Sequence, residues 1–274
     1  MATKSLLIDG RFSTATDPLF SIDLIDNFLF CEHIRAIRND LPFWKEHLQL
    51  IDLKLKLFNL TPPDFFQNDG KKLRRQIDRT LVKNKLFKSA ILHLYFIRNK
   101  SGISYILQTE PLDSTNYQLN TTGLKVGLFD KIHKGISPLS SLDLGSEPFW
   151  KLANADKQNS PCDELLLLDE NESILEAPFK NIYIVTGTEL FTPAPQLGVY
   201  LDVSQKTIQQ ACENAGLKWN FMKKVEKQIL LKADEIFLAN SLQGIEWIKS
   251  FDQKRYFNKR TKQVLEEFNK LLLI

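Results

Sequence analysis

The sequence predicts a mixed α+β protein built from two domains. The chain has 274 residues, which is long for one small hydrophobic core and short for three domains. Segments with the alternation of strands and segments with the spacing of amphipathic helices occur in both halves. Between Pro111 and Gly123 the chain becomes polar and rich in turn formers, which indicates a boundary. We therefore expect an N-terminal α/β domain over residues 1–112, a linker over 113–124 and a C-terminal α/β domain over 125–274.

The first half alternates between strand-like and helix-like segments. A helix is expected to open at Pro42 and to stop before Pro62, because Leu48, Ile51 and Leu55 recur on one helical face. The other elements expected here are strands at residues 6–8, 28–37, 90–98 and 103–108 and a helix at 70–86. A polar turn joins the last two strands into a hairpin.

The second half also mixes strands and helices. Ser204 has the residue type of a helix N-cap, and Gly216 has that of a C-terminal stop. The expected elements are strands at residues 165–168, 181–185 and 235–238 and helices at 205–215 and 258–272.

Charge and composition argue against nucleic-acid and membrane partners. Lys and Arg number 36 and Asp and Glu 33, and the two signs are interspersed along the chain. The densest basic run, residues 71–75, is typical of the solvated face of a helix. No window approaches the roughly 18 apolar residues of a membrane span, and no export signal is visible at the N-terminus. The expected location is the cytoplasm.

The cysteines and histidines indicate neither a disulfide framework nor a metal site. The cysteines are odd in number and lack CxxC spacing, which fits buried thiols in a reducing compartment. The histidines have no partner at a metal-ligand spacing, so no bound metal is expected. These residues are Cys31, Cys162, Cys212, His33, His47, His93 and His133.

Four segments in the second half together resemble one protein family. They read DELLLLDENESILEAPFKNIYIV, LFTP, LDVSQ and ADEIFLANSLQGI, in this order, and an upstream segment reads FCEHIRAIRNDLPFWKEHL. The chain thus resembles the class IV family of pyridoxal-phosphate enzymes, which includes aminodeoxychorismate lyase and the branched-chain and D-amino acid aminotransferases. The resemblance implies the two-domain fold-type IV architecture, pyridoxal phosphate as cofactor, a homodimer, and an amino-acid-like or chorismate-like ligand.

Three positions depart from the family pattern where its chemistry depends on cations. Asp143 stands twenty residues before Asp163, where the family carries the lysine that forms the Schiff base with the cofactor. A carboxylate has no nitrogen for that reaction. Leu50 and Gln205 replace two family arginines, of which the resemblance assigns the first to the cofactor phosphate. We therefore expect pyridoxal phosphate to be poorly held and the usual Schiff base not to form.

Other positions match what the family places around its cofactor. Glu176 occupies the position of the family carboxylate that keeps the pyridine nitrogen of the cofactor protonated. Val203 and Ser204 stand where backbone amides at a helix N-terminus cradle the phosphate, and Ser241 stands at a second hydroxyl donor. The alternatives that involve no ligand are that Glu176 is a solvated carboxylate and that Ser204 only caps the helix.

A different lysine is an alternative source of the missing amine. Lys151 is excluded, because eight residues of helix place it about 12 Å from Asp143 along the axis. Lys180 shares strand parity with Glu176, and Lys134 lies upstream in a segment expected to be a loop.

Three functional hypotheses follow. The first is a non-catalytic family member that serves as a binding or scaffold protein. The second is an active aminotransferase or aminodeoxychorismate lyase that uses a different amine. The third is an enzyme of another class with Asp143 and Glu176 as an acid and base pair.

Overall fold

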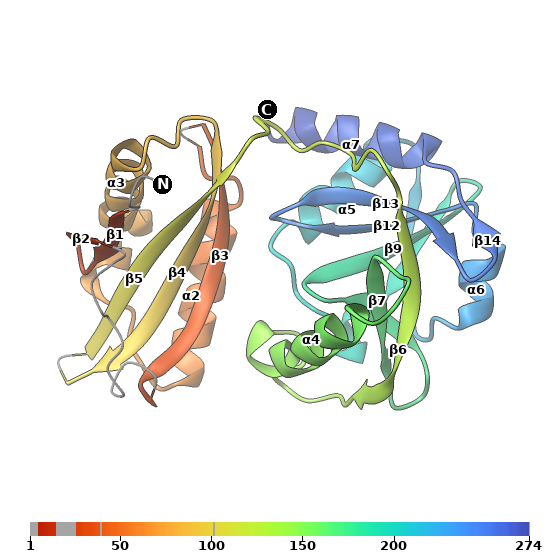
Figure 1. The fold of residues 1–274 in the computed structure, drawn as a ribbon, viewed down its shortest axis with the longest axis horizontal. Coiled ribbons are helices and arrows are strands. Elements are labelled where there is room, and N and C mark those ends of the chain that lie inside the picture. The colour runs from red at the N-terminus through yellow and green to blue at the C-terminus, as the bar shows by residue number, and fades with distance from the viewer. Residues whose placement is uncertain (1–4, 15–25, 39, 101, 274) are drawn as a thin grey trace. The chain divides into compact units, whose positions relative to one another are not determined.

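The structure is a computed structural model, and it describes residues 5–14, 26–38, 40–100 and 102–273 (Figure 1). The chain divides into two units, Met1–Asn116 and Tyr117–Ile274. Each unit contains its own β-sheet.

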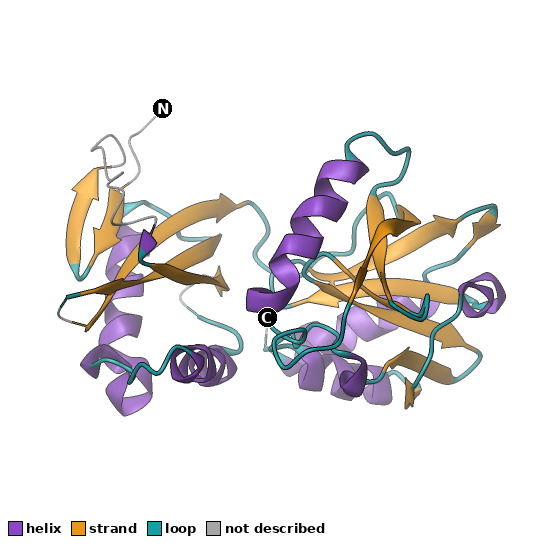
Figure 2. Cartoon of the chain, turned by 90° about the horizontal axis from the view of Figure 1, so that it is seen from below, coloured by secondary structure: helices purple, strands orange, loops and turns teal. Residues whose placement is uncertain are grey.

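The first unit is an antiparallel sheet in the strand order β2-β1-β5-β4-β3. Its helices lie on one face of this sheet (Figure 2). The strands are β1 (Ser5–Ile8), β2 (Arg11–Thr14), β3 (Phe28–Ile37), β4 (Ser89–Asn99) and β5 (Gly102–Leu112). The helices are α2 (Trp44–Leu57), the 3-10 turn η1 (Asp64–Phe66) and α3 (Gln67–Lys83).

Alternation along the strands fixes which face of this sheet is buried. On β4, Leu92, Leu94 and Phe96 are fully buried, whereas His93 and Tyr95 between them are half-buried. A slip of one residue would turn the apolar set away from the helices, so burial specifies the register. The unit therefore has an apolar face under its helices and a more polar face on the other side.

A buried charge cluster ties α2 to the sheet. Glu32 of β3 accepts a hydrogen bond from Lys54 Nζ at 2.7 Å, and its other oxygen lies 2.7 Å from His47 Nδ1. All three side chains are almost completely buried. Burial by itself would raise the pKa of Glu32, but the Lys54 charge and the bond to His47 outweigh it and lower that pKa to about 2.

Acid should therefore destabilise the protein through Glu32. A carboxylate whose pKa is lowered by folding from 4.5 stabilises the folded state above that pH, and the stabilisation is lost as the pH falls towards 2. We expect about 3 kcal/mol of unfolding free energy to be lost over this range. Urea unfolding at a series of pH values measures it. A Glu32→Gln variant with the same pH dependence as the parent would contradict this assignment.

The second unit is built on a larger mixed sheet, in the order β11-β10-β9-β12-β13-β6-β7-β8, with β14 paired to β13. The strands are β6 (Leu124–Lys134), β7 (Glu164–Asp169), β8 (Ile174–Ala177), β9 (Lys180–Thr186), β10 (Glu189–Pro193), β11 (Lys218–Met222), β12 (Glu235–Asn240), β13 (Gly244–Phe251) and β14 (Lys254–Arg255). The helices are α4 (Asp143–Lys157), the 3-10 turn η2 (Pro195–Leu197), α5 (Gln205–Asn214), α6 (Lys227–Lys232) and α7 (Lys259–Leu271).

An extra pairing between β8 and β9 closes part of this sheet into a ring of strands. An apolar core that includes Leu166, Ile182 and Ile236 draws its residues from several of these strands. A second cluster packs Trp150 and Ala153 of α4 against strands β6 and β7. Strands β6 and β8 both pair with β7, one on each side, and Lys134 of β6 and Glu176 of β8 carry the site described below.

Most expected elements are confirmed within one or two residues, including helix α5 and its stop at Gly216, whose φ is 78°. The hairpin of β4 and β5 is also confirmed, although both strands are longer than expected. Lys134 was wrongly placed in a loop, because it is the last residue of β6. The expectation of buried thiols holds for Cys212 and is wrong for Cys31 and Cys162, which are partly exposed.

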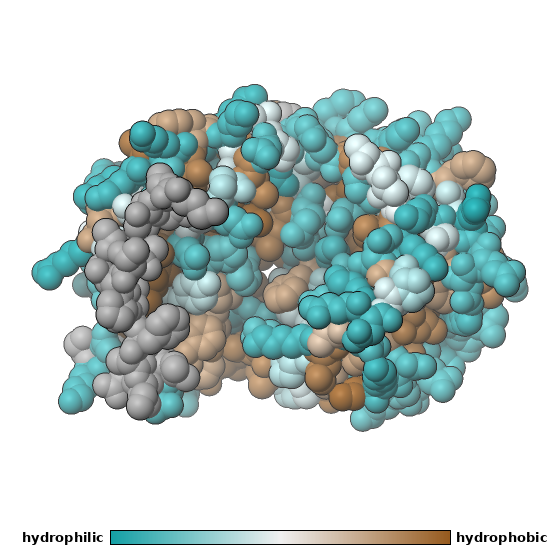
Figure 3. Space-filling model, viewed as in Figure 1, coloured by the Kyte–Doolittle hydropathy of each residue, from teal (hydrophilic) through white to brown (hydrophobic). Residues whose placement is uncertain are grey.

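No helix in the described ranges is both long enough and apolar enough to cross a membrane. Hydrophilic side chains cover most of the face drawn in Figure 3, and apolar side chains form scattered patches between them. Such scattering is ordinary for a protein surface.

Candidate functional site

The second unit contains a buried ion pair between two of its strands. Lys134 Nζ, at the end of β6, donates to Glu176 Oε1 on β8 over 2.8 Å. The side chains are 1% and 0% exposed, so both charges are withdrawn from water. Burial lowers the pKa of the Lys134 amine, and the Glu176 charge opposes that shift.

Two aromatic residues complete the surroundings of Glu176. Trp150 Nε1 of α4 donates to Glu176 Oε1 over 2.9 Å, and the backbone N–H of Tyr200 donates to Glu176 Oε2. The Trp150 ring packs edge-on against the Tyr200 ring, with the ring centres 4.9 Å apart, and at a tilt against the Phe179 ring, with the ring centres 4.1 Å apart. Asn181 holds the same segment by donating to the Tyr200 carbonyl over 2.8 Å. Both oxygens of Glu176 thus accept hydrogen bonds from the chain itself.

A second carboxylate, that of Asp202, accepts hydrogen bonds from two serine hydroxyls near the start of α5. Asp202 is 3% exposed, and its Oδ1 accepts hydrogen bonds from the Ser204 hydroxyl and from the Ser204 backbone N–H, the latter at 2.8 Å. Its Oδ2 accepts from the Ser241 hydroxyl at 3.1 Å. The start of a helix attracts anions, and here the chain supplies its own. The expected side-chain cap by Ser204 is not formed, because its hydroxyl bonds Asp202.

The remaining candidate residues lie on helices of the two units. Asp143 is the first residue of α4 and is half-buried, and its Oδ1 accepts from the Leu144 N–H at 3.0 Å. Gln205 is the first residue of α5, directly after Val203 and Ser204. Leu50 lies on α2 in the first unit and is buried in that unit's core.

Of the two lysines proposed as substitutes, one contacts Glu176 and the other does not reach it. Lys180 Nζ lies 2.8 Å from a Glu246 oxygen and 3.1 Å from a Glu164 oxygen. These two carboxylates outweigh the effect of burial and raise the pKa of Lys180. Lys180 is therefore paired with Glu164 and Glu246, and of the two lysines left open as alternatives it is Lys134 that contacts Glu176.

Sequence reasoning missed Trp150, Tyr200 and Asp202. Nothing in the residue types singled them out, although Asp202 belongs to the LDVSQ segment. Their roles depend on how α4 and the chain after β10 fold back over β8.

The chain is similar in sequence to aminotransferases. The model of the family described as amino-transferase class IV matches residues 29–251. A curated relative, the probable branched-chain-amino-acid aminotransferase of Thermotoga maritima, is 21% identical over 146 residues. That match covers 48% of this chain and 51% of the relative, so the chain spans about half the length of the curated relative it matches.

Solved structures share the fold over nearly the whole chain. A branched-chain aminotransferase of Thermoproteus uzoniensis, in a crystal structure with norvaline, has a TM-score of 0.83 at 18% identity, covering 99% of this chain and 95% of that one. The Escherichia coli branched-chain aminotransferase has a TM-score of 0.79 at 16% identity, covering 96% and 92%. A third, from Thermobaculum terrenum in its pyridoxal-phosphate form, has a TM-score of 0.80 at 16% identity, covering 98% and 94%. The fold-type IV architecture expected from the sequence is confirmed.

Proposed function

The chain belongs to the class IV aminotransferase family, and from that premise we propose that it is a member that does not form the family's Schiff base with pyridoxal phosphate. It acts instead as a binding or scaffold protein with an inherited, internally occupied site. Asp143 at the lysine position motivates the proposal, and the contacts of Glu176 carry it.

The ion pair of Lys134 and Glu176 is the observation on which the proposal rests. By family resemblance, Glu176 is the carboxylate that faces the ring nitrogen of the cofactor. Here the Lys134 ammonium holds that carboxylate at 2.8 Å. A ring nitrogen would have to displace the ammonium and leave it unpaired in the interior, which costs several kcal/mol.

Asp202 supports the same conclusion at the other end of the inherited site. The hydroxyls of Ser204 and Ser241 stand where the family binds the cofactor phosphate, and both donate to Asp202. A phosphate with nearly two negative charges would meet this carboxylate and would lack the arginines that Leu50 and Gln205 replace. The residues at both ends therefore fit pyridoxal phosphate poorly.

The second candidate is an active aminotransferase or aminodeoxychorismate lyase in which Lys134 supplies the amine. The observation in its favour is the lowered pKa of this buried lysine, since such lysines are the ones suited to Schiff-base chemistry. The third hypothesis, an acid and base pair of Asp143 and Glu176, has less support than the other two. Both Glu176 oxygens already accept hydrogen bonds from the chain.

Borohydride trapping separates the first two candidates. The purified chain is incubated with pyridoxal phosphate, reduced with borohydride and mapped by mass spectrometry. We expect no stoichiometric adduct on a buried lysine, and no amino transfer or 4-aminobenzoate release. The exposed Lys151 is an internal comparator for non-specific modification. A stoichiometric adduct on Lys134 would overturn the proposal and favour the active enzyme.

We further propose a homodimer in the cytoplasm that binds an amino-acid-like or chorismate-like small molecule. Support comes from family membership and from the branched-chain aminotransferases that share the fold. Light scattering after size-exclusion chromatography tests the dimer through the molar mass. A mass equal to that of one chain would refute it.

A further inference from the structure

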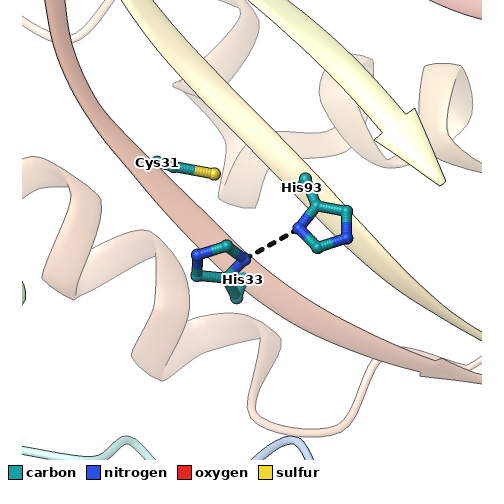
Figure 4. Close-up of side chains that lie close together, drawn as sticks. All are labelled: Cys31, His33 and His93. Atoms are coloured by element: carbon teal, nitrogen blue, oxygen red, sulfur yellow. Dashed lines mark hydrogen bonds between the residues drawn. The ribbon is translucent and has the colours of Figure 1, made fainter. Parts of the chain in front are cut away.

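Three side chains with metal-binding atoms meet on the more polar face of the first unit's sheet (Figure 4). Cys31 and His33 lie two residues apart on β3, so they share a face. His93 lies on β4 directly opposite His33 in the antiparallel register. Residues 31 and 93 are far apart in the sequence, and strand pairing alone brings them together.

The distances between these side chains suit a small cation. One ligand atom from each residue lies within 4.8 Å of the others, and His33 Nδ1 is 2.9 Å from His93 Nδ1. Bonds of about 2.0 Å from zinc to nitrogen and 2.3 Å to sulfur in a tetrahedron imply ligand separations of roughly 3.3–3.7 Å. Small side-chain rotations would bring the three atoms to these separations.

The carboxylate of Glu110 lies next to the ring of His93. Glu110 Oε2 of β5 lies 3.5 Å from His93 Nε2, on the ring nitrogen that does not face His33. Metal-binding histidines usually direct their second nitrogen at such a group, which fixes the tautomer and makes the ring a better ligand. This is a second observation, independent of the clustering, that indicates a ligand site.

We propose that Cys31, His33 and His93 bind a divalent cation of the zinc type, with Glu110 orienting His93. One thiolate and two imidazoles form a donor set that Zn²⁺ prefers, and three protein ligands leave a fourth position for water or a small ligand. The ring that donates in the His33–His93 hydrogen bond shifts its proton to Nε2 when the cation binds. The thiol proton is released to solvent, so one proton leaves for each cation bound.

The site is independent of the ion pair between Lys134 and Glu176, because it lies in the other unit. The histidines are scattered along the sequence, which is why no bound metal was expected. In the fold, two of the four histidines lie side by side next to a cysteine.

Cobalt titration tests the site on the full chain, purified with a phosphine reductant in place of a thiol. We expect one equivalent of Co²⁺ to produce a thiolate-to-cobalt charge-transfer band that Zn²⁺ displaces. Cys31→Ser should remove this band, and His33→Gln and His93→Gln should each abolish stoichiometric binding. Glu110→Gln should keep the band and weaken binding about 10- to 100-fold.

Matched controls use a cysteine and a histidine outside the cluster. Cys162→Ser and His133→Gln should bind cobalt like the parent, since both residues lie in the second unit. Absence of the band in the parent, its persistence in Cys31→Ser or its loss in Cys162→Ser would each overturn the proposal. Equal thermal unfolding midpoints without cobalt establish that the variants are folded. If Cys31→Ser fails to fold, the two histidine variants decide the outcome.

Discussion

The Lys134→Met variant is expected to lose about 3–5 kcal/mol of unfolding free energy. Lys134 and Glu176 are 1% and 0% exposed, and the substitution leaves the Glu176 carboxylate buried without its cation. The hydrogen bonds from Trp150 and from the Tyr200 backbone remain, but neither donor carries a charge. Urea unfolding of both proteins at neutral pH measures the difference.

The control for this experiment is a lysine of the same unit that is exposed. Lys151 pairs with Glu147 across one helical turn at 72% and 44% exposure, so Lys151→Met should change stability by no more than about 0.5 kcal/mol. The double variant Lys134→Met with Glu176→Gln should recover part of the loss, because no buried charge is left unpaired. A Lys134→Met variant as stable as the parent would show that the pair is not charged in the interior.

The Lys54→Met variant is expected to lose about 3 kcal/mol, at the lower end of the range for a broken buried pair. Lys54 Nζ lies 2.7 Å from Glu32 and 5.2 Å from the centre of the Phe30 ring. Glu32 keeps its contact with His47, which limits the loss. The measurement is again urea unfolding, with fluorescence and circular dichroism followed together, since the two units need not unfold as one.

Lys56 provides the matched control two residues further along α2. It is 66% exposed and pairs with Asp52 one turn earlier, so Lys56→Met should be almost neutral. The double variant Lys54→Met with Glu32→Gln should be more stable than Lys54→Met alone. The opposite order would contradict a charged Glu32 in the folded state.

Much of the fold was predictable because local chemistry determines it. The apolar spacing that predicted a helix after Pro42 reappears in α2, where Ile51 and Leu55 are fully buried. Strand β6 was not predicted, because its burial neither alternates nor forms a continuous run, and only Val126, Phe129 and Lys134 of it are buried. Strands are read from a sequence by one of these two patterns.

The candidate site was predictable only in part. Glu176, Ser204 and Ser241 could be selected from the family resemblance, and the structure buries all three. Their hydrogen-bond and ion-pair partners could not be selected from the sequence. Lys134 and Glu176, for example, are 42 residues apart in the chain. Which lysine reaches Glu176 depends on the register of β6, β7 and β8, and the residue types alone left both Lys134 and Lys180 open.

Residue identity and spacing were sufficient to find the family, the two-part α+β organisation and the aspartate at position 143. The charges that meet in the interior could be identified only from the fold. Lys134 forms an ion pair with Glu176. The hydroxyls of Ser204 and Ser241 donate to Asp202. The side chains of His33, His93 and Cys31 form a cluster. A buried charge or polar group must find a partner wherever the closed sheet places one, and sequence distance does not reveal that partner.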